Sequence, residues 1–315
     1  MAGIDIKDVL CVILAGAGKD TSSVNGRSKC FATLNYRQIY EYTLDCARDV
    51  GARNIVVACN STDAGDVHRY DSKVDLLESE KSIILAERLV QAHEYAKNMH
   101  PGCRLLVLYA DHCFPTKKGL EDALSRADLD ESGVVLPVVP STYQSSYRKF
   151  YSPKFFHCRE YKWAHTGIVL AEPSKVNLAC LDDITSVRKP FQLGLLNTMV
   201  TLPRIALIVS RRLGPEYLYL LKDESLACLC DFLDLPSAAS SFAQKIPVAV
   251  SKDVGTRLFA TPIQLLATPY GELSLEVDLA KYLEPFEANY RRIKERIAVE
   301  HELLDRVGAY SHKLN

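Results

Sequence analysis

The sequence carries almost no net charge. Its 38 lysines and arginines are balanced by 39 aspartates and glutamates, which leaves a formal net charge of −1 at pH 7. Proteins that bind nucleic acid in general usually carry a strong excess of basic residues. We therefore expect no nucleic acid among the partners of this chain.

Paired cysteines are also missing. The chain has ten cysteines, but no two are arranged as Cys-x-x-Cys. That absence argues against a zinc or iron–sulfur centre of the usual cysteine-rich kind. Several cysteines fall within apolar stretches, where a free thiol behaves as a small hydrophobe. Met1 to Lys7 carries the acidic residue Asp5 and does not read as a secretory signal, so we expect a reducing cytoplasm as the setting.

No apolar run is long enough to suggest a membrane span. The longest candidate, residues 193–209, is interrupted by Asn197, Pro203 and Arg204. A transmembrane helix needs about 20 consecutive apolar residues. We therefore expect packed helices here, with an interfacial helix anchored by Arg204, Arg211 and Arg212 as the alternative.

The first 140 residues alternate between two kinds of pattern. Short, continuously apolar runs are separated by segments with helical periodicity. This alternation predicts an α/β fold with a Rossmann-like, mostly parallel sheet covered by helices on both faces. The expected strands are 9–15, 54–59, 104–110 and 133–139, and the expected helices are 39–50, 84–98 and 118–127.

After residue 140 the regular alternation of apolar runs and helical segments ends. We expect a strand pair at 154–161 and 165–171, a mostly helical stretch over 188–235, short strands at 246–250 and 273–277, and a long C-terminal helix over 283–307. The chain would then consist of an α/β domain, 1–185 and 245–315, and a helical insertion or subdomain, 186–244. The apolar stripe of the last helix predicts packing on its own domain, with a homodimer contact as the alternative.

A glycine loop follows the first expected strand. Gly16 and Gly18 are followed by Lys19 and, ten residues later, by Lys29. Glycines allow the backbone to approach a phosphate closely, and lysines supply the countercharge. A plain strand-exit turn is the alternative. Asp111 also follows the carboxyl end of a strand, where open α/β sheets bind their ligands.

Five segments occur in an order that indicates a family. They read VILAGAGK, Ser28-Lys29, YADHCFPT, HTGIVLAEPSKV and LEVDLAKYL. This series resembles the nucleotidyltransferase branch of the glycosyltransferase type A fold, the nucleotide-diphospho-sugar transferase type, and in particular its molybdenum-cofactor guanylyltransferase-like group. The resemblance covers roughly residues 1–180 and 260–285.

The resemblance implies a role for each matching residue. Lys29 and Asp111 would be catalytic, with Lys29 on the α-phosphate, and Asp111 and Asp278 would hold Mg²⁺, with Glu276 helping through water. Helix or turn caps are the alternatives for the two aspartates, and a solvated surface lysine is the alternative for Lys29. The implied nucleotide-binding residues are Leu14, Ala15, Gly16, Ala17, Gly18, Lys19, Lys29 and Ser82.

The acceptor side is implied less directly. His165, Thr166 and Gly167 occupy the family's acceptor region, and an ordinary buried strand start explains them equally well. Arg188 and Lys189 are candidates to clamp the acceptor's phosphate, with a solvated basic pair as the alternative. A transition-metal site built from Asp111, His112 and Cys113 is not expected, because three adjacent residues do not easily converge on one ion.

The expected function is nucleotidyl transfer. A nucleoside monophosphate would pass from a nucleoside triphosphate to a phosphorylated small molecule, such as a sugar, polyol or cofactor phosphate, with release of pyrophosphate. An acceptor phosphate is largely ionised at pH 7, so catalysis requires positioning and charge neutralisation by magnesium and lysine. The alternatives are a glycosyltransferase of the same fold and a catalytically silent nucleotide-binding protein.

Overall fold

We describe a computed structural model of the chain. It describes residues 4–16, 23–24, 27–79, 85–151, 155–179, 206–277 and 282–311.

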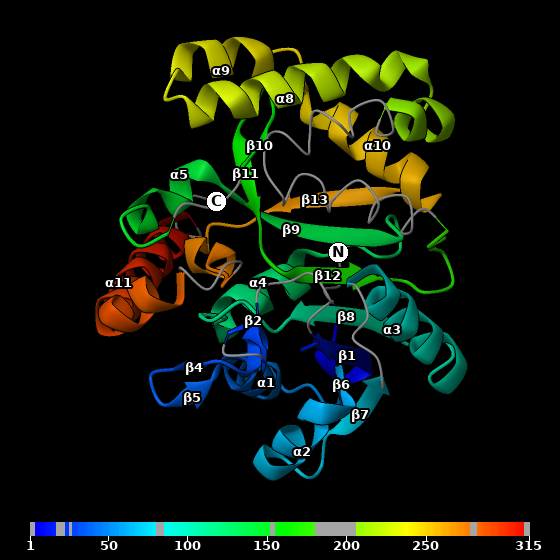
Figure 1. Ribbon diagram of the computed structural model, residues 1–315, viewed down its shortest axis with the longest axis vertical. Helices are drawn as coiled ribbons and strands as arrows, with labels where there is room; N and C mark the ends of the chain where they lie inside the picture. Colours follow the sequence, from blue (N-terminus) through cyan, green and yellow to red (C-terminus); the bar gives the residue numbers. More distant parts are fainter. Residues whose placement is uncertain are drawn as a thin grey trace.

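A nine-stranded sheet forms the centre of the molecule (Figure 1). The strand order is β10-β11-β9-β12-β8-β1-β6-β7, and β13 pairs with β9. Strands β8, β1, β6 and β7 are parallel, whereas β12 runs antiparallel between β8 and β9. The predicted mostly parallel α/β sheet is confirmed. The strands are β1 (Val9–Leu14), β6 (Asn54–Asn60), β7 (Asp75–Ser79), β8 (Arg104–Tyr109), β9 (Val134–Pro140), β10 (Phe156–His157), β11 (Lys162–His165), β12 (Ile168–Ala171) and β13 (Ile263–Ala267).

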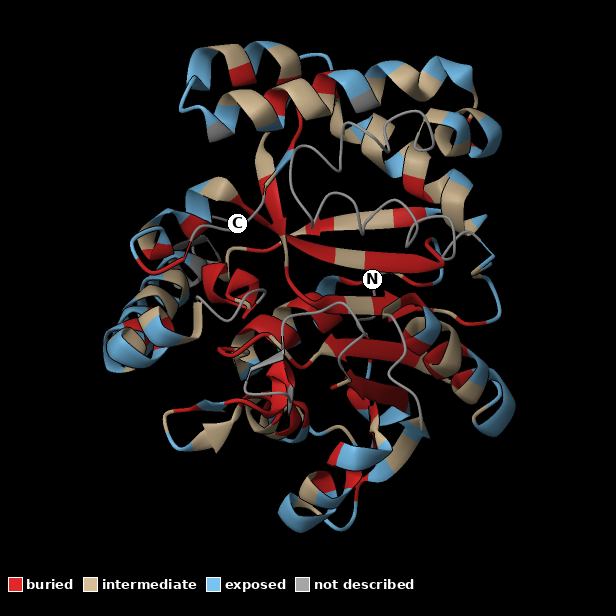
Figure 2. Ribbon diagram, in the orientation of Figure 1, coloured by how far each residue is buried: buried red, intermediate tan, exposed pale blue. Residues whose placement is uncertain are grey.

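Helices cover both faces of this sheet because the central strands are apolar on both sides. Alternate residues of β1, such as Cys11 and Ile13, join a cluster that includes α1 and α4. The intervening residues, such as Leu10 and Val12, pack with α3. Figure 2 shows these strands buried between the helical layers. The helices of this part are α1 (Ile39–Asp49), α2 (Ser61–Tyr70), α3 (Leu85–Met99) and α4 (Lys117–Arg126).

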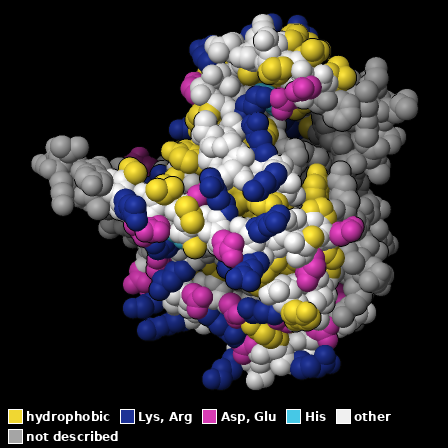
Figure 3. Space-filling model, turned by 90° about the vertical axis from the view of Figure 1, so that its left-hand side faces the viewer, with side chains coloured by type: hydrophobic (Ala, Val, Ile, Leu, Met, Phe, Trp, Pro, Cys, Tyr) yellow, Lys and Arg dark blue, Asp and Glu magenta, His cyan; other side chains and the backbone are white. Residues whose placement is uncertain are grey.

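The long C-terminal helix α11 (Leu283–Ser311) begins beside the sheet. Its Phe286, Ile293 and Ile297 are buried against Tyr147 and Leu275, so the predicted apolar stripe packs on the chain's own core. Arg291 and Arg296 of α11 form i,i+4 ion pairs with Glu295 and Glu300. On the flank shown in Figure 3, Lys and Arg side chains are interspersed with Asp and Glu.

Helices α8 (Leu218–Phe232) and α9 (Pro236–Ala243) pack together above β10 and β11 (Figure 1). Residues 188–205 of the predicted helical stretch 188–235 lie outside the described residues, and the division into two domains stays a prediction. No described helix is both long and apolar enough to cross a membrane.

Three sequence predictions in the second half are wrong. Residues 248–259 form helix α10 (Val248–Phe259), where a strand at 246–250 was expected, because a short apolar run fits either period. Residues 271–274 form a 3-10 turn, η5 (Gly271–Ser274), and only Glu276 of the expected strand 273–277 makes a bridge. The expected strand 154–161 is reduced to β10, because Cys158 to Tyr161 turn back toward β11.

Candidate active site

Two neighbouring strands deliver the candidate residues to one edge of the sheet. Leu14 at the end of β1 lies in register with Tyr109 at the end of β8. The N–H of Ala110 then donates to the carbonyl of Leu14 at 3.2 Å. Gly16 and Asp111 therefore leave the sheet at the same edge, as the sequence predicts for a ligand site in an open α/β sheet.

Lys29 and Asp111 form a buried ion pair at this edge. Lys29 lies in the turn η2 (Lys29–Phe31), and its Nζ is 2.7 Å from Asp111 Oδ2. The two side chains are only 11% and 16% exposed, so the surface alternative for Lys29 is excluded. Burial opposes both charges, but the Asp111 carboxylate raises the pKa of Lys29 above its usual value. Lys29 and His112 in turn lower the pKa of Asp111 to about 2 against the same opposition from burial.

This lowered pKa predicts how the pair responds to acid. A carboxyl group whose folded pKa lies below its unfolded value stabilises the fold above the unfolded pKa, and this stability is lost as pH falls through the folded pKa. We expect the difference in unfolding free energy between wild type and Asp111→Asn to be constant from pH 7 to about 5 and to shrink toward pH 2. Urea titrations at several pH values measure this difference; a gap that is unchanged at pH 2 would contradict the assignment.

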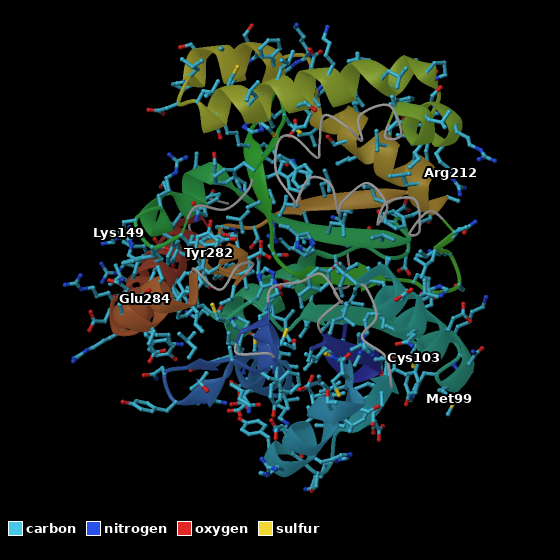
Figure 4. The ribbon with its side chains drawn as sticks, viewed as in Figure 1. Met99, Cys103, Lys149, Arg212, Tyr282 and Glu284 are labelled. Atoms are coloured by element: carbon cyan, nitrogen blue, oxygen red, sulfur yellow. The ribbon has the colours of Figure 1, made fainter. Side chains whose placement is uncertain are left out.

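His112 and Glu276 lie beside Asp111 and form a cluster of possible ligand groups with it. The segment 275–277 runs antiparallel to 111–113, with a bridge between His112 and Glu276. The Nδ1–H of His112 donates to the carbonyl of Leu273 at 2.8 Å, which leaves Nε2 facing Glu276 Oε2 at 3.6 Å. The Tyr151 hydroxyl donates to Glu276 Oε1 at 3.1 Å and helps to hold that carboxylate. Tyr282, which packs against Tyr151, is labelled in Figure 4 near the start of α11.

The donor atoms of this cluster suit a divalent cation. One ligand atom each from Asp111, His112 and Glu276 lies within 4.8 Å of the others. Asp111 Oδ1 and His112 Nε2 are buried and make no hydrogen bond to the residues that the structure describes. Buried polar atoms are nearly always satisfied, so these two orphaned atoms fit a cation bound between them. Cys113 is not part of the cluster, because its thiol donates to the carbonyl of Leu275.

The predicted acceptor residues lie beside His112. A side chain at Gly167 would meet the His112 ring, because a Cβ there would lie 2.2 Å from its Cδ2 and Nε2 atoms. The ring of His165 lies 6.4 Å from that of His112, and the Thr166 hydroxyl donates to the carbonyl of Pro137 at 2.8 Å. Gly167 thus makes room for His112. Acceptor binding by His165, Thr166 and Gly167 stays a prediction.

Sequence reasoning missed a buried arginine beside Gly16. Arg88 on α3 is 1% exposed, and a Cβ at Gly16 would lie 2.8 Å from its Nε and Nη2 atoms. The guanidinium donates to Asn60 Oδ1 at 2.8 Å, and its Nε–H has no hydrogen-bond partner among the residues that the structure describes. Within the described ranges no carboxylate forms an ion pair with it, and burial lowers its pKa. In the sequence Arg88 is one arginine among many on amphipathic helices, so no local pattern distinguishes it.

Several predicted site residues lie outside the described residues. They are Ala17, Gly18, Lys19, Ser82, Arg188, Lys189 and Asp278. The structure therefore describes the nucleotide-side positions Leu14, Ala15, Gly16 and Lys29, the metal-side position Asp111, and the three acceptor-side positions 165–167.

Comparison with known proteins identifies the fold. No family model and no curated protein sequence matches the chain. Among solved structures, the chain is similar to a hypothetical transferase from Thermus thermophilus, with 20% identity, a TM-score of 0.56, and coverage of 87% of this chain and 99% of that one. At this identity the likeness shows a shared fold.

Two further structures are more distant. The inositol-1-phosphate CTP transferase from T. maritima has 18% identity and a TM-score of 0.42, with 55% of this chain and 73% of that one covered. The bifunctional IspDF from Campylobacter jejuni has 13% identity and a TM-score of 0.39, with 55% and 43% covered. Neither likeness is close enough to carry an argument about this chain. Membership of the molybdenum-cofactor guanylyltransferase-like group stays a prediction.

Proposed function

We propose that the protein is a nucleotidyltransferase that joins a nucleoside monophosphate, taken from a nucleoside triphosphate, to a phosphorylated small molecule. The observation that carries the proposal is the buried Lys29–Asp111 pair at the carboxyl edge of β1 and β8. One oxygen of Asp111 contacts Lys29, and the other has no hydrogen-bond partner among the described residues. The pair thus offers a cation for phosphate and a carboxylate oxygen for a metal at one point.

The reaction needs this combination of groups. An oxygen of the acceptor phosphate attacks the α-phosphorus, and the bond from that phosphorus to the pyrophosphate oxygen breaks. Lys29 would neutralise the charge that grows on the α-phosphate oxygens, and the acceptor phosphate needs no strong base because it is already ionised. Asp111, with Glu276 and His112 beside it, would hold Mg²⁺. The ion, when bound, neutralises the triphosphate and orients its oxygens.

Arg88 would support the triphosphate side from below. A buried guanidinium that lies against Gly16 and has no carboxylate partner in the described part of the chain suits a bound anion. Its contact with Gly16 explains why a residue without a side chain is needed there. The loop backbone could then approach a phosphate while Arg88 adds positive charge beneath it.

The proposal is tested by the release of pyrophosphate. The purified chain is mixed with Mg²⁺, each of the four ribonucleoside triphosphates and a panel of sugar, polyol and cofactor phosphates. We expect pyrophosphate only when triphosphate and acceptor are both present, together with a nucleoside-diphosphate product in the mass spectrum. Consumption of a nucleotide sugar without pyrophosphate would indicate the glycosyltransferase alternative. Binding of a triphosphate without turnover on any acceptor would indicate a silent nucleotide-binding protein.

Arg88→Met should weaken triphosphate binding by about 10- to 100-fold, because a hydrogen bond to a charged group contributes about 1.5–3 kcal/mol. In steady-state kinetics the KM for the triphosphate should rise, whereas the KM for the acceptor should stay unchanged. Arg126→Met is the matched control, since Arg126 is exposed and paired with Asp122. Calorimetric titration of the triphosphate measures the effect. Unchanged affinity together with a lower melting temperature would show that Arg88 is only structural.

A further inference from the structure

A second group of ligating side chains lies at the junction of β10 and α8, away from the sheet edge that carries Lys29. His157 on β10 is 2% exposed, and it faces Glu224 and Cys228 on α8. Because Glu224 and Cys228 are four residues apart on a helix, they lie on the same face. Figure 1 shows β10 rising toward α8 at this point.

The three ligating atoms form a nearly equilateral triangle. His157 Nδ1 is 3.4 Å from Glu224 Oε1 and 3.6 Å from Cys228 Sγ, and that sulfur is 3.5 Å from the same carboxylate oxygen. A tetrahedral zinc ion has bonds of about 2.0 Å to nitrogen or oxygen and about 2.3 Å to sulfur, which separates its ligand atoms by about 3.3 to 3.6 Å. The observed triangle therefore has the size of one face of a zinc coordination tetrahedron.

The groups around the triangle are arranged as they are around bound metals. His157 Nε2 lies 3.4 Å from Asp231 Oδ2, one helical turn beyond Cys228. This nitrogen is buried and makes no hydrogen bond within the described residues, so a small shift of the Asp231 carboxylate would give it the acceptor that the outer nitrogen of a metal-bound histidine commonly has. The backbone N–H of His157 donates to Glu224 Oε1 at 3.1 Å, which orients the second ligand. Lys162 pairs with Asp231 and balances its charge.

We infer that His157, Glu224 and Cys228 form a zinc-binding site, with Asp231 as a positioning residue and the fourth coordination position open to water. The sequence lacks paired cysteines, so this mixed set of nitrogen, oxygen and sulfur ligands has no motif that would identify it. The ion would tie α8 to the edge of the sheet. Binding would therefore raise the stability of the folded chain.

The experiment uses the full chain under reducing conditions. After removal of metals by chelation and addition of Zn²⁺, we expect one bound zinc ion per chain at this site and a higher melting temperature. Substitution with Co²⁺ should produce the absorption band of a thiolate–cobalt bond. Cys228→Ala should remove that band and lower zinc affinity by at least 100-fold, and Asp231→Asn should lower it by about tenfold or more.

Two control variants separate this site from other metal sites. Cys230→Ala changes a thiol on the same helix that is not part of the triangle, and it should bind zinc as wild type does. Glu276→Gln alters the cluster at Asp111 and should keep the thiolate–cobalt band. The inference is overturned if wild type binds no zinc, or if Cys228→Ala binds zinc and cobalt as wild type does. Because the readouts are metal content and absorption, they do not depend on transferase activity.

Discussion

Lys29→Met should reduce nucleotidyl transfer by about a thousandfold. The ammonium lies 2.7 Å from Asp111 in a nearly closed site, where a charge stabilises a developing oxyanion far more than it would in water. Loss of a single preorganised donor typically costs 10²- to 10³-fold in kcat. The effect is measured as the rate of pyrophosphate release at saturating triphosphate. Full activity of the variant would overturn the assignment.

The variant also leaves the Asp111 carboxylate buried without its partner. Removing one partner of a buried ion pair typically destabilises a protein by about 3–5 kcal/mol, because the other charge stays buried without compensation. A fall in activity could therefore come from unfolding. The double variant Lys29→Met/Asp111→Asn removes both charges, and we expect it to recover most of the stability and none of the activity. Lys118→Met, which changes an exposed lysine on α4, is the control that should leave both unchanged.

Gly167→Ala should destabilise the fold and disturb the site together. The backbone φ of Gly167 is +68°, and a Cβ there would lie 2.2 Å from the His112 ring. Left-handed backbone costs a non-glycine residue about 1–2 kcal/mol, and overpacking adds about 1–3 kcal/mol. At about 2–4 °C for each kcal/mol in a chain of this order of size, we expect the melting temperature to fall by about 4–20 °C.

Gly102→Ala separates the two causes. Gly102 has a φ of +84°, and a Cβ there would meet no atom within 4 Å. We expect only the backbone cost of the left-handed conformation, which should lower the melting temperature by about 2–8 °C, measured by differential scanning calorimetry. In Gly167→Ala the displaced His112 should also lower activity, whereas Gly102→Ala should keep it. Equal shifts in the two variants would show that the His112 ring moves aside without cost.

The first half of the fold could be read from the sequence because its elements are strongly periodic. The run from Val9 to Leu14 is buried throughout, and α1 ends within one residue of its predicted end. Helix α2 and strand β7 were missed, because Ser61 to Ser79 carries many polar residues and no long apolar run. The error over Val248 to Phe259 has a related origin, because the short apolar run from Val248 to Val250 fits a strand or a helix.

The composition of the candidate site was also partly predictable. A glycine turn and an aspartate after two apolar strands must share one edge if those strands are parallel neighbours, and β1 and β8 are. That argument placed Gly16 and Asp111 together without coordinates. It could not show that Lys29 is buried on Asp111, because the link between them depends on the path of the turns after β1.

The sequence by itself therefore determined the apolar strands β1, β6, β8 and β9, their order along the chain and the residue types that follow β1 and β8 at the sheet edge, since hydrophobic periodicity records how each segment is buried. Only the tertiary structure decided that His112 faces Glu276, that Arg88 lies beneath Gly16, and that His157 meets Glu224 and Cys228. Each of these contacts joins segments that are far apart along the chain. Such contacts depend on strand register and helix packing, which the periodicity of a single segment does not determine.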